Sequence, residues 1–269
     1  MAMCIVSASA FSQTADIGVG YVAHYPSLRD GKSDLTNQYI LLANAAESKF
    51  YSPKTGYLDS LNSTPEGKAR YQEMTNNAYL GGKMEELPRR DGSYYVVKSM
   101  PDNKLLHYDS AGMDKYFYEE QPGEWNWEIG DAVKGILGYE CIEATTEFHG
   151  RKWTAWFAPE IPVQNEPWKL GGLPGLILEA CPEGGQYRFI ATGIQQPAKP
   201  ISPVYLANEY EKTNRIDFLR EKRSFLNNPL GKINAQLNGE IKVMKTEGQD
   251  GSSLFASESV VDFIETDYK

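Results

Sequence analysis

Short runs of apolar and aromatic residues, separated by turn-forming residues, recur along most of this 269-residue chain. In the run 15–25, Ile17, Val19 and Tyr21 alternate with smaller or polar residues, which is the pattern of a half-buried strand. Further runs of this kind lie at 92–100, 104–112, 114–121 and 124–130. Such short strands are stable only side by side in a sheet. The pattern therefore predicts a mainly β (α+β) fold, a curved antiparallel meander or half-barrel with a few packing helices.

A second strand is predicted over 37–51, and two segments have helical character. Thr64 is a good N-cap, Pro65 suits the first helical position, and the following helix is expected to end before Gly81. The segment 207–239 places apolar residues among charges at helical spacing and is interrupted by an Asn-Asn-Pro-Leu-Gly stretch. We expect these helices to pack against the sheet.

The central region 138–162 predicts two strands joined by a turn at His149. In the second strand Trp153 faces one side and Trp156 the other, and a strand that is apolar on both faces is covered on both faces. His149, at the tip of the hairpin, is interpreted as an exposed turn residue rather than as a metal ligand.

The stretch 166–180, Glu-Pro-Trp-Lys-Leu-Gly-Gly-Leu-Pro-Gly-Leu-Ile-Leu-Glu-Ala, is rich in glycine. A phosphate-binding loop would lead into a helix, whereas Gly175 is followed by three branched apolar residues that indicate a strand. Pro174 and Gly175 suit the centre of a type II turn, in which the glycine takes a positive φ. Leu173, before proline, is expected to be extended. The stretch therefore predicts a long loop and a tight turn that begins a buried strand at 176–180.

This passage also carries a resemblance. The structural motif consists of Gly172, Leu173, Pro174, Gly175, Leu176 and Ile177. It is similar to the signature of the GLPGLI family, secreted proteins of Gram-negative bacteria that are largely without assigned function. The resemblance covers residues 125–195, with Glu166 where the family usually has glycine. It implies export and brings no catalytic residues with it.

The N-terminus has the features of a secretory signal peptide. An apolar run ends in small residues, and Ala10 and Ser12 stand three and one residues before a cut ahead of Gln13. We therefore interpret residues 1–12 as a signal-peptide remnant and expect an exported protein of the periplasm or outer membrane. The alternative interpretation is a first β-strand of the domain.

The rest of the chain is expected to form a single β-rich domain over 13–245 and an acidic C-terminal tail over 246–269. We expect this tail to be mobile and able to add one edge strand. No window beyond residue 13 is apolar enough for a transmembrane helix. The net charge of −9 argues against nucleic acid as a partner, because phosphate binding requires clustered Lys and Arg.

Chemical motifs are weak. His24, His107 and His149 lie far apart in the sequence and lack metal-ligand spacing, so neither a metal nor a cofactor is predicted. The sequence has no Gly-x-Ser-x-Gly nucleophile motif. Cys141 and Cys181 are expected at opposite ends of a simple meander, unless the long loop between their strands crosses over, so a disulfide between them stays open.

The remaining signal is an excess of tryptophan in one third of the chain. One interpretation is a large core, since aromatic residues dominate core burial. The other is an aromatic-lined β-surface that binds an apolar ligand, a peptide or an outer-membrane protein without catalysis. The candidate ligand-binding residues are Trp127, Trp153, Trp156 and Trp168, with Trp168 as a rim in a glycine-flanked loop. A secreted, peptidase-like hydrolase with a dispersed active site is the alternative function.

Export has a direct test. Because cleavage after Ser12 would remove the apolar run, mass spectrometry of protein recovered from its native envelope should find an N-terminus at or near Gln13. An intact Met1 on protein from the cytosol would contradict the signal-peptide interpretation.

Overall fold

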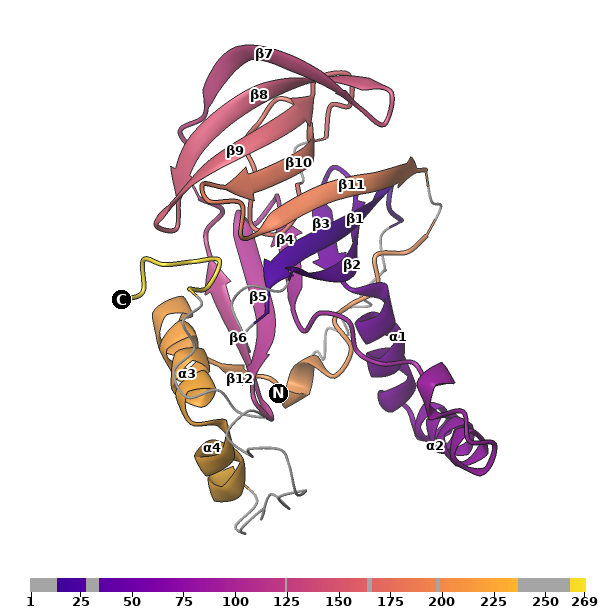
Figure 1. Ribbon diagram of the computed structural model, residues 1–269. Coiled ribbons are helices and arrows are strands. Elements are labelled where there is room, and N and C mark those ends of the chain that lie inside the picture. The colour runs from indigo at the N-terminus through magenta and orange to yellow at the C-terminus, as the bar shows by residue number, and fades with distance from the viewer. Residues whose placement is uncertain (1–13, 28–33, 124, 164–165, 197–198, 237–261) are drawn as a thin grey trace, which may run out of the picture.

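The protein is built on one twelve-stranded sheet that is not closed into a barrel (Figure 1). The computed structural model describes residues 14–27, 34–123, 125–163, 166–196, 199–236 and 262–269. The strand order is β12-β6-β5-β4-β3-β2-β1-β11-β10-β9-β8-β7, and every pair except β12 with β6 is antiparallel. The prediction of a mainly β, curved and largely antiparallel sheet is confirmed.

Two meanders make up this sheet, and they meet where β1 pairs with β11. The first comprises β1 (Ile17–Pro26), β2 (Asp34–Ala43), β3 (Glu47–Tyr51), β4 (Tyr95–Ser99), β5 (Lys104–Ala111) and β6 (Asp114–Glu120), with the short β12 (Glu211–Lys212) at its edge. The second comprises β7 (Glu128–Ile136), β8 (Tyr139–Phe148), β9 (Arg151–Ala158), β10 (Leu176–Pro182) and β11 (Arg188–Gln195). The pairing joins strands that are far apart in the sequence.

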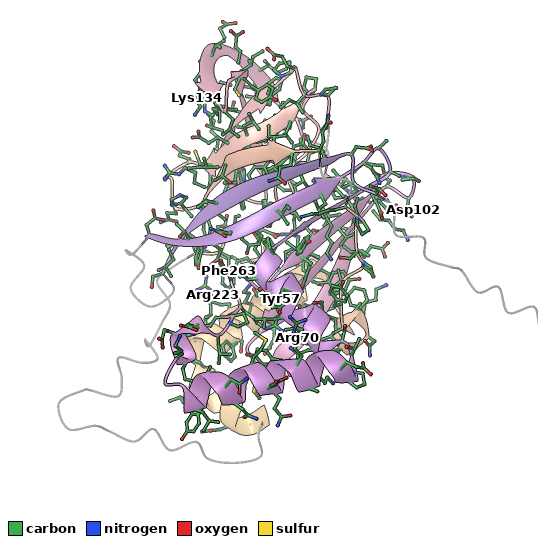
Figure 2. The ribbon with its side chains drawn as sticks, turned by 90° about the vertical axis from the view of Figure 1, so that its right-hand side faces the viewer. Tyr57, Arg70, Asp102, Lys134, Arg223 and Phe263 are labelled. Atoms are coloured by element: carbon green, nitrogen blue, oxygen red, sulfur yellow. The ribbon has the colours of Figure 1, made fainter. Side chains whose placement is uncertain are left out.

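Helices lie on different sides of the sheet. The helices are α1 (Pro53–Asn62), α2 (Pro65–Leu80), α3 (Arg215–Asn227) and α4 (Pro229–Gln236), with 3-10 turns at Met84–Glu86 and Ala207–Glu209. In Figure 1, α3 packs beside β5 and β6, whereas α1 and α2 extend from the opposite side. Helix α2 buries none of its residues and stands off the sheet, as Figure 2 also shows around Arg70.

The N-terminal elements follow from local signals, with two corrections. Thr64 caps α2 as predicted, because its side chain accepts a hydrogen bond from the Gly67 amide. The single strand predicted over 37–51 is wrong, since Asn44 interrupts it by accepting hydrogen bonds from two following amides and turns the chain between β2 and β3. Helix α1 was not predicted, although Ser52 and Pro53 form a recognisable cap and first turn.

The central hairpin is as predicted. β8 and β9 are joined by His149 and Gly150, whose φ angles of 49° and 77° are those of a tight two-residue hairpin turn. Trp153 on β9 is fully buried, and Trp156 lies on the other face of the strand beneath Lys134. The Trp153 face of the strand is therefore covered, whereas the face with Lys152, Thr154 and Trp156 stays partly exposed, so the prediction of cover on both faces is wrong.

The type II turn predicted at Gly175 is wrong. The positive φ lies at Gly172 (85°), and Gly175 is not among the glycines with positive φ in the described chain. Gly175 is needed for a different reason, because a Cβ there would lie 2.3 Å from the carbonyl oxygen of Ala158. The glycine thus allows β10 to begin directly against the end of β9.

The structure describes only part of the two chain ends for which the sequence makes predictions. Residues 1–13 and 237–261 lie outside the described residues, and with them the signal-peptide remnant and most of the predicted tail. The described end of the tail, 262–269, forms no strand and buries Phe263 and Tyr268 against the body, so the expectation of a mobile tail or edge strand is wrong for this part. Cys141 and Cys181 are both free.

Gly175 offers a test of this packing. The substitution Gly175→Val should lower the free energy of unfolding by roughly 1–3 kcal/mol, because the new side chain would collide with the Ala158 backbone. Urea denaturation of the purified variant measures this. The control is Gly135→Val, since a Cβ at Gly135 meets no atom within 4 Å. Equal stability of the two variants would contradict the steric role of Gly175.

Candidate functional site

A cavity of about 270 Å³ lies between the sheet, α3 and the C-terminal segment. Seven parts of the chain line one side of the cavity: β1, β2, the approach to β4, β5, β6, β11 and the loop that carries Trp168. Helix α3 and residues 263–265 close the other side. The aromatic residues of its lining are Tyr25, Tyr39, Tyr94, Tyr118, Trp168, Tyr187, Phe189, Phe218 and Phe263. An apolar cavity with a few converging polar groups is the usual form of a small-molecule site.

One wall of the cavity is a ladder of stacked rings. Tyr39 stacks on Tyr94 at 4.9 Å between ring centroids, Tyr94 on His107 at 5.5 Å, and His107 on Tyr118 at 4.9 Å. His107 and Tyr118 stand opposite each other on the neighbouring strands β5 and β6, so the strand spacing sets their separation. Tyr94 precedes β4, and Tyr39 lies on β2, which is separated from β4 by β3. Because the ring faces contact one another, the ring edges and polar atoms are left for the cavity.

Asp109 is the charged residue of this wall. It is 2% exposed, and its carboxylate accepts hydrogen bonds from Lys222 Nζ and Ser93 Oγ, each at 2.5 Å. His107 Nε2 lies 3.9 Å from the same carboxylate. Burial opposes the charged form, but the Lys222 ammonium outweighs it and holds the pKa of Asp109 well below its usual value. Burial in turn lowers the pKa of His107, which favours the neutral imidazole.

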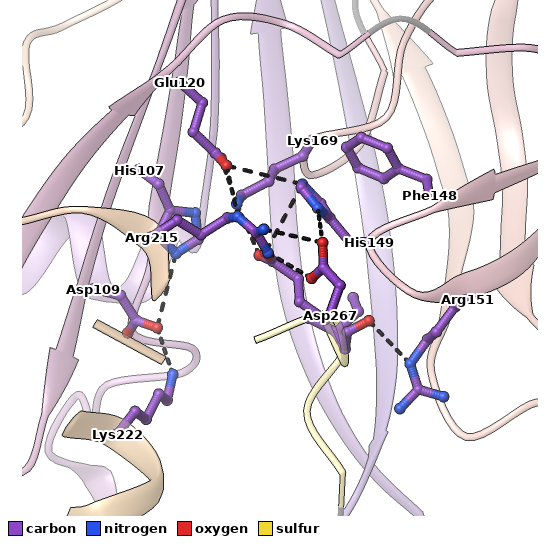
Figure 3. A network of polar contacts seen from close by, with 12 residues as sticks. His107, Asp109, Glu120, Phe148, His149, Arg151, Lys169, Arg215, Lys222 and Asp267 are labelled. Carbon is purple, nitrogen blue, oxygen red and sulfur yellow. Dashed lines mark hydrogen bonds and ion pairs between the residues drawn. The ribbon is translucent and has the colours of Figure 1, made fainter. Parts of the chain in front are cut away.

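Beside the cavity lies an ionic cluster, shown in Figure 3. Lys169 Nζ, whose side chain is fully buried, contacts Glu120 at 2.6 Å and Glu265 at 2.8 Å. Arg215 contacts the same two carboxylates at 3.1 and 2.9 Å and Asp267 at 2.6 Å. Burial opposes ionisation of Glu265, but Lys169 and His149 lower its pKa to about 2. The cluster joins β6, the Trp168 loop, α3 and the C-terminal segment.

The same cluster contains His149, contrary to its interpretation as an exposed turn residue. Its side chain is 15% exposed, and Nδ1 lies 3.2 Å from Asp267. His149, Glu265 and Asp267 bring ligand atoms within 4.8 Å of one another, a spacing that a metal ion could bridge. Arg215 already pairs with both carboxylates, so a cation of the protein occupies this position.

Further contacts hold the C-terminal segment in place. Arg151 donates to the carbonyl oxygens of Phe263 and Ile264, and the Thr266 amide donates to the carbonyl of His149 at 2.9 Å. Arg223 of α3 lies over the Phe263 ring, 4.3 Å from its centroid, and both are labelled in Figure 2. The segment therefore forms one wall of the cavity.

The four predicted tryptophans do not form one surface. Trp153 and Trp168 stack at 5.5 Å in the core, and only Trp168 of the four lines the cavity. Trp156 lies on the opposite face of β9, and Trp127 donates through Nε1 to the Gly171 carbonyl at 2.7 Å. The expected position of Trp168 as an exposed rim is wrong, because it is 1% exposed. Whether any of the four binds a ligand stays a prediction.

Sequence reasoning missed most of the cavity. His107, Asp109 and Tyr118 occupy alternating positions on two adjacent predicted strands, and this alternation was the available signal. Nothing local indicates that α3 and the C-terminal segment cover these residues. Their approach depends on contacts between parts of the chain that are far apart in sequence.

The fold and cavity define an open, mainly β protein with a buried aromatic cluster. Its similarity to solved structures is distant. The fold is similar to two crystal structures of PNGF-II, in space groups C2 and P21, with TM-scores of 0.50 and 0.51 and 13% sequence identity in each. The matches cover 77% and 78% of this chain but only 32% and 34% of PNGF-II, so the chain spans about a third of that protein. This likeness concerns the fold alone.

In sequence, the match is local. A family described as "Protein of unknown function (Porph_ging)", an uncharacterised family found in Bacteroidetes, matches residues 147–179, from the end of β8 into β10. This range includes the motif 172–177. No curated protein matches the sequence significantly.

Glu265 provides a test of the ionic cluster. Glu265→Gln should lower the free energy of unfolding by about 3 kcal/mol at pH 7, because it removes one charge from a buried network. The carboxyl's folded pKa of about 2 lies below its ordinary value, so its contribution is present above about pH 4.5 and is lost as pH falls toward 2. The difference between variant and parent should therefore shrink from pH 5 to pH 3 in urea denaturation. Glu73→Gln, at an exposed position of α2, is the control. A difference that is independent of pH would contradict the assignment.

Proposed function

We propose that this protein acts by binding a small apolar ligand in the aromatic cavity, without covalent chemistry. The observation that carries the proposal is the cavity itself: nine aromatic side chains line it. Its volume of about 270 Å³ is close to the lower end of ordinary ligand sites and favours a small molecule over a peptide. The proposed site differs from the predicted tryptophan surface and shares only Trp168 with it.

The walls of the cavity favour binding because they are already ordered. Stacked rings and the ionic cluster fix the side chains, so little conformational entropy would be lost when a ligand enters. Burial of apolar ligand surface against these rings would contribute about 25 cal/mol per Å².

The alternative of a hydrolase finds little support in the polar groups of the cavity. A serine nucleophile needs a histidine between it and the carboxylate, so that the histidine can accept the hydroxyl proton. Here Ser93 donates directly to Asp109, and His107 stands on the other side of that carboxylate. The order is therefore wrong for activation of Ser93.

Export to the periplasm or outer membrane is part of the proposal. Its support is the apolar run that ends at Ser12 and the similarity to the GLPGLI family. No helix in the described part of the chain is both long and apolar enough to span a membrane. In that compartment the partner could be an apolar ligand, a peptide or an outer-membrane protein. The size of the cavity favours the small apolar ligand.

A neutral fluorescent probe tests the binding function. N-phenyl-1-naphthylamine should bind the purified protein with increased fluorescence, because the cavity offers a mainly apolar lining. Ala23→Leu, which adds bulk to the cavity wall, should weaken this binding at least about tenfold by steric exclusion.

The matched control is Ala132→Leu, which makes the same change at an exposed position of the edge strand β7. It should leave probe binding unchanged. Melting temperatures of both variants would show that they remain folded. If the parent protein gave no fluorescence change, or if Ala23→Leu bound as well as the parent, the cavity would not be the binding site.

A further inference from the structure

The deep end of the cavity, defined by the lining residues His107 and Tyr118, includes two buried polar atoms that have no hydrogen-bond partner among the described residues. These are the Tyr118 hydroxyl and His107 Nδ1. Tyr118 is fully buried and His107 is 4% exposed, and both line the cavity. A buried polar group without a partner is rare in native proteins and costs about 1–3 kcal/mol, so each calls for a specific partner.

The two atoms have complementary hydrogen-bonding properties. Nε2 of His107 faces the Asp109 carboxylate, which favours the proton on that nitrogen and leaves Nδ1 as an acceptor. The Tyr118 hydroxyl both donates and accepts. A single ligand group that donates to His107 and accepts from Tyr118 would satisfy both.

Both rings are packed against neighbouring side chains. Tyr118 is held between His107, at 4.9 Å, and Phe218, at 5.6 Å, with Lys169 Nζ 4.7 Å from its ring centroid. His107 is held on its other face by Tyr94. The positions of the two polar atoms are therefore fixed by packing.

Charge limits the ligand further. Asp109 is paired with Lys222, and Glu265 with Lys169 and Arg215. An anion at the deep end would lie beside these two carboxylates, and a cation would compete with amino and guanidinium groups that are already in contact with them. Either would have to disrupt a buried ion pair, which costs several kcal/mol.

We infer that the cavity selects a neutral ligand with an apolar, ring-sized body and one hydroxyl or amide group, and that this group bonds to Tyr118 and His107 at the deep end. The inference rests on the proposed binding function and names the chemical class of its ligand. Tyr118 and His107 act as specificity-determining residues, whereas the remaining rings supply apolar contact.

Three probes share the naphthalene ring system and differ only in their polar group: 2-naphthol, naphthalene and 2-naphthoate. Each is titrated calorimetrically into the full chain at pH 7. Naphthol should bind roughly tenfold more tightly than naphthalene, since it adds hydrogen bonds to unpaired buried groups. Naphthoate should bind more weakly than naphthol because of its charge.

Two variants test whether Tyr118 and His107 cause the preference for naphthol over naphthalene. Tyr118→Phe should reduce the affinity for naphthol to that for naphthalene and leave naphthalene binding unchanged. It should not lower the melting temperature, because the lost hydroxyl has no partner within the described chain. His107→Phe keeps the ring stack and should have the same effect on the preference. Tyr116→Phe, on the same strand but outside the cavity lining, should change nothing.

The outcomes are distinct. If none of the three probes binds, the proposed binding function fails and the inference fails with it. If naphthalene binds as tightly as naphthol, the binding function stands and the inference is overturned. It is also overturned if naphthoate binds most tightly, or if Tyr118→Phe and His107→Phe both retain the preference for naphthol.

Discussion

The fully buried ammonium group of Lys169 is the constraint on which the rest of this structure depends. Removing an ammonium group from water costs several kcal/mol unless opposite charges and hydrogen bonds replace the solvent. Glu120 and Glu265 do this at 2.6 and 2.8 Å, so β6 and the C-terminal segment must both reach the loop that carries Lys169. Arg215 extends the same requirement to α3. Once these elements meet, they enclose the cavity as a consequence.

Inside that enclosure, aromatic packing determines which surfaces face the cavity. His107 and Tyr118 stack on one another because their neighbouring strands lie about 4.8 Å apart, close to the separation of stacked rings. Their faces are thereby used within the wall, and their edges, with the polar atoms of Tyr118 and His107, are left over. A sheet that would otherwise present only apolar surface thus acquires a small number of fixed hydrogen-bonding positions.

These features support the proposed binding function. The polar groups at the cavity are paired in ways that neutralise charge, as Asp109 is by Lys222, and the serine nearby is not placed for activation. The similarity to PNGF-II extends to the fold over about a third of that protein, and its sequence identity of 13% carries no site residues across. The geometry of the cavity therefore carries the proposed function.

Local signals in the sequence determined much of the fold: the strand at 15–25, the hairpin turn at His149, the cap of α2 at Thr64 and the helical region after 207. Turn and cap preferences act over a few residues, so they can be recognised without knowing which strands become neighbours. Only the tertiary structure decided the site. Strand alternation predicts which residues share a face within one strand, but the β5–β6 register that puts His107 opposite Tyr118, and the cover provided by α3 and residues 263–265, appear only in the structure. For the same reason Trp168 proved to be core and Gly175 proved to need space rather than a positive φ, because both depend on contacts with residues remote in sequence or on a neighbouring strand.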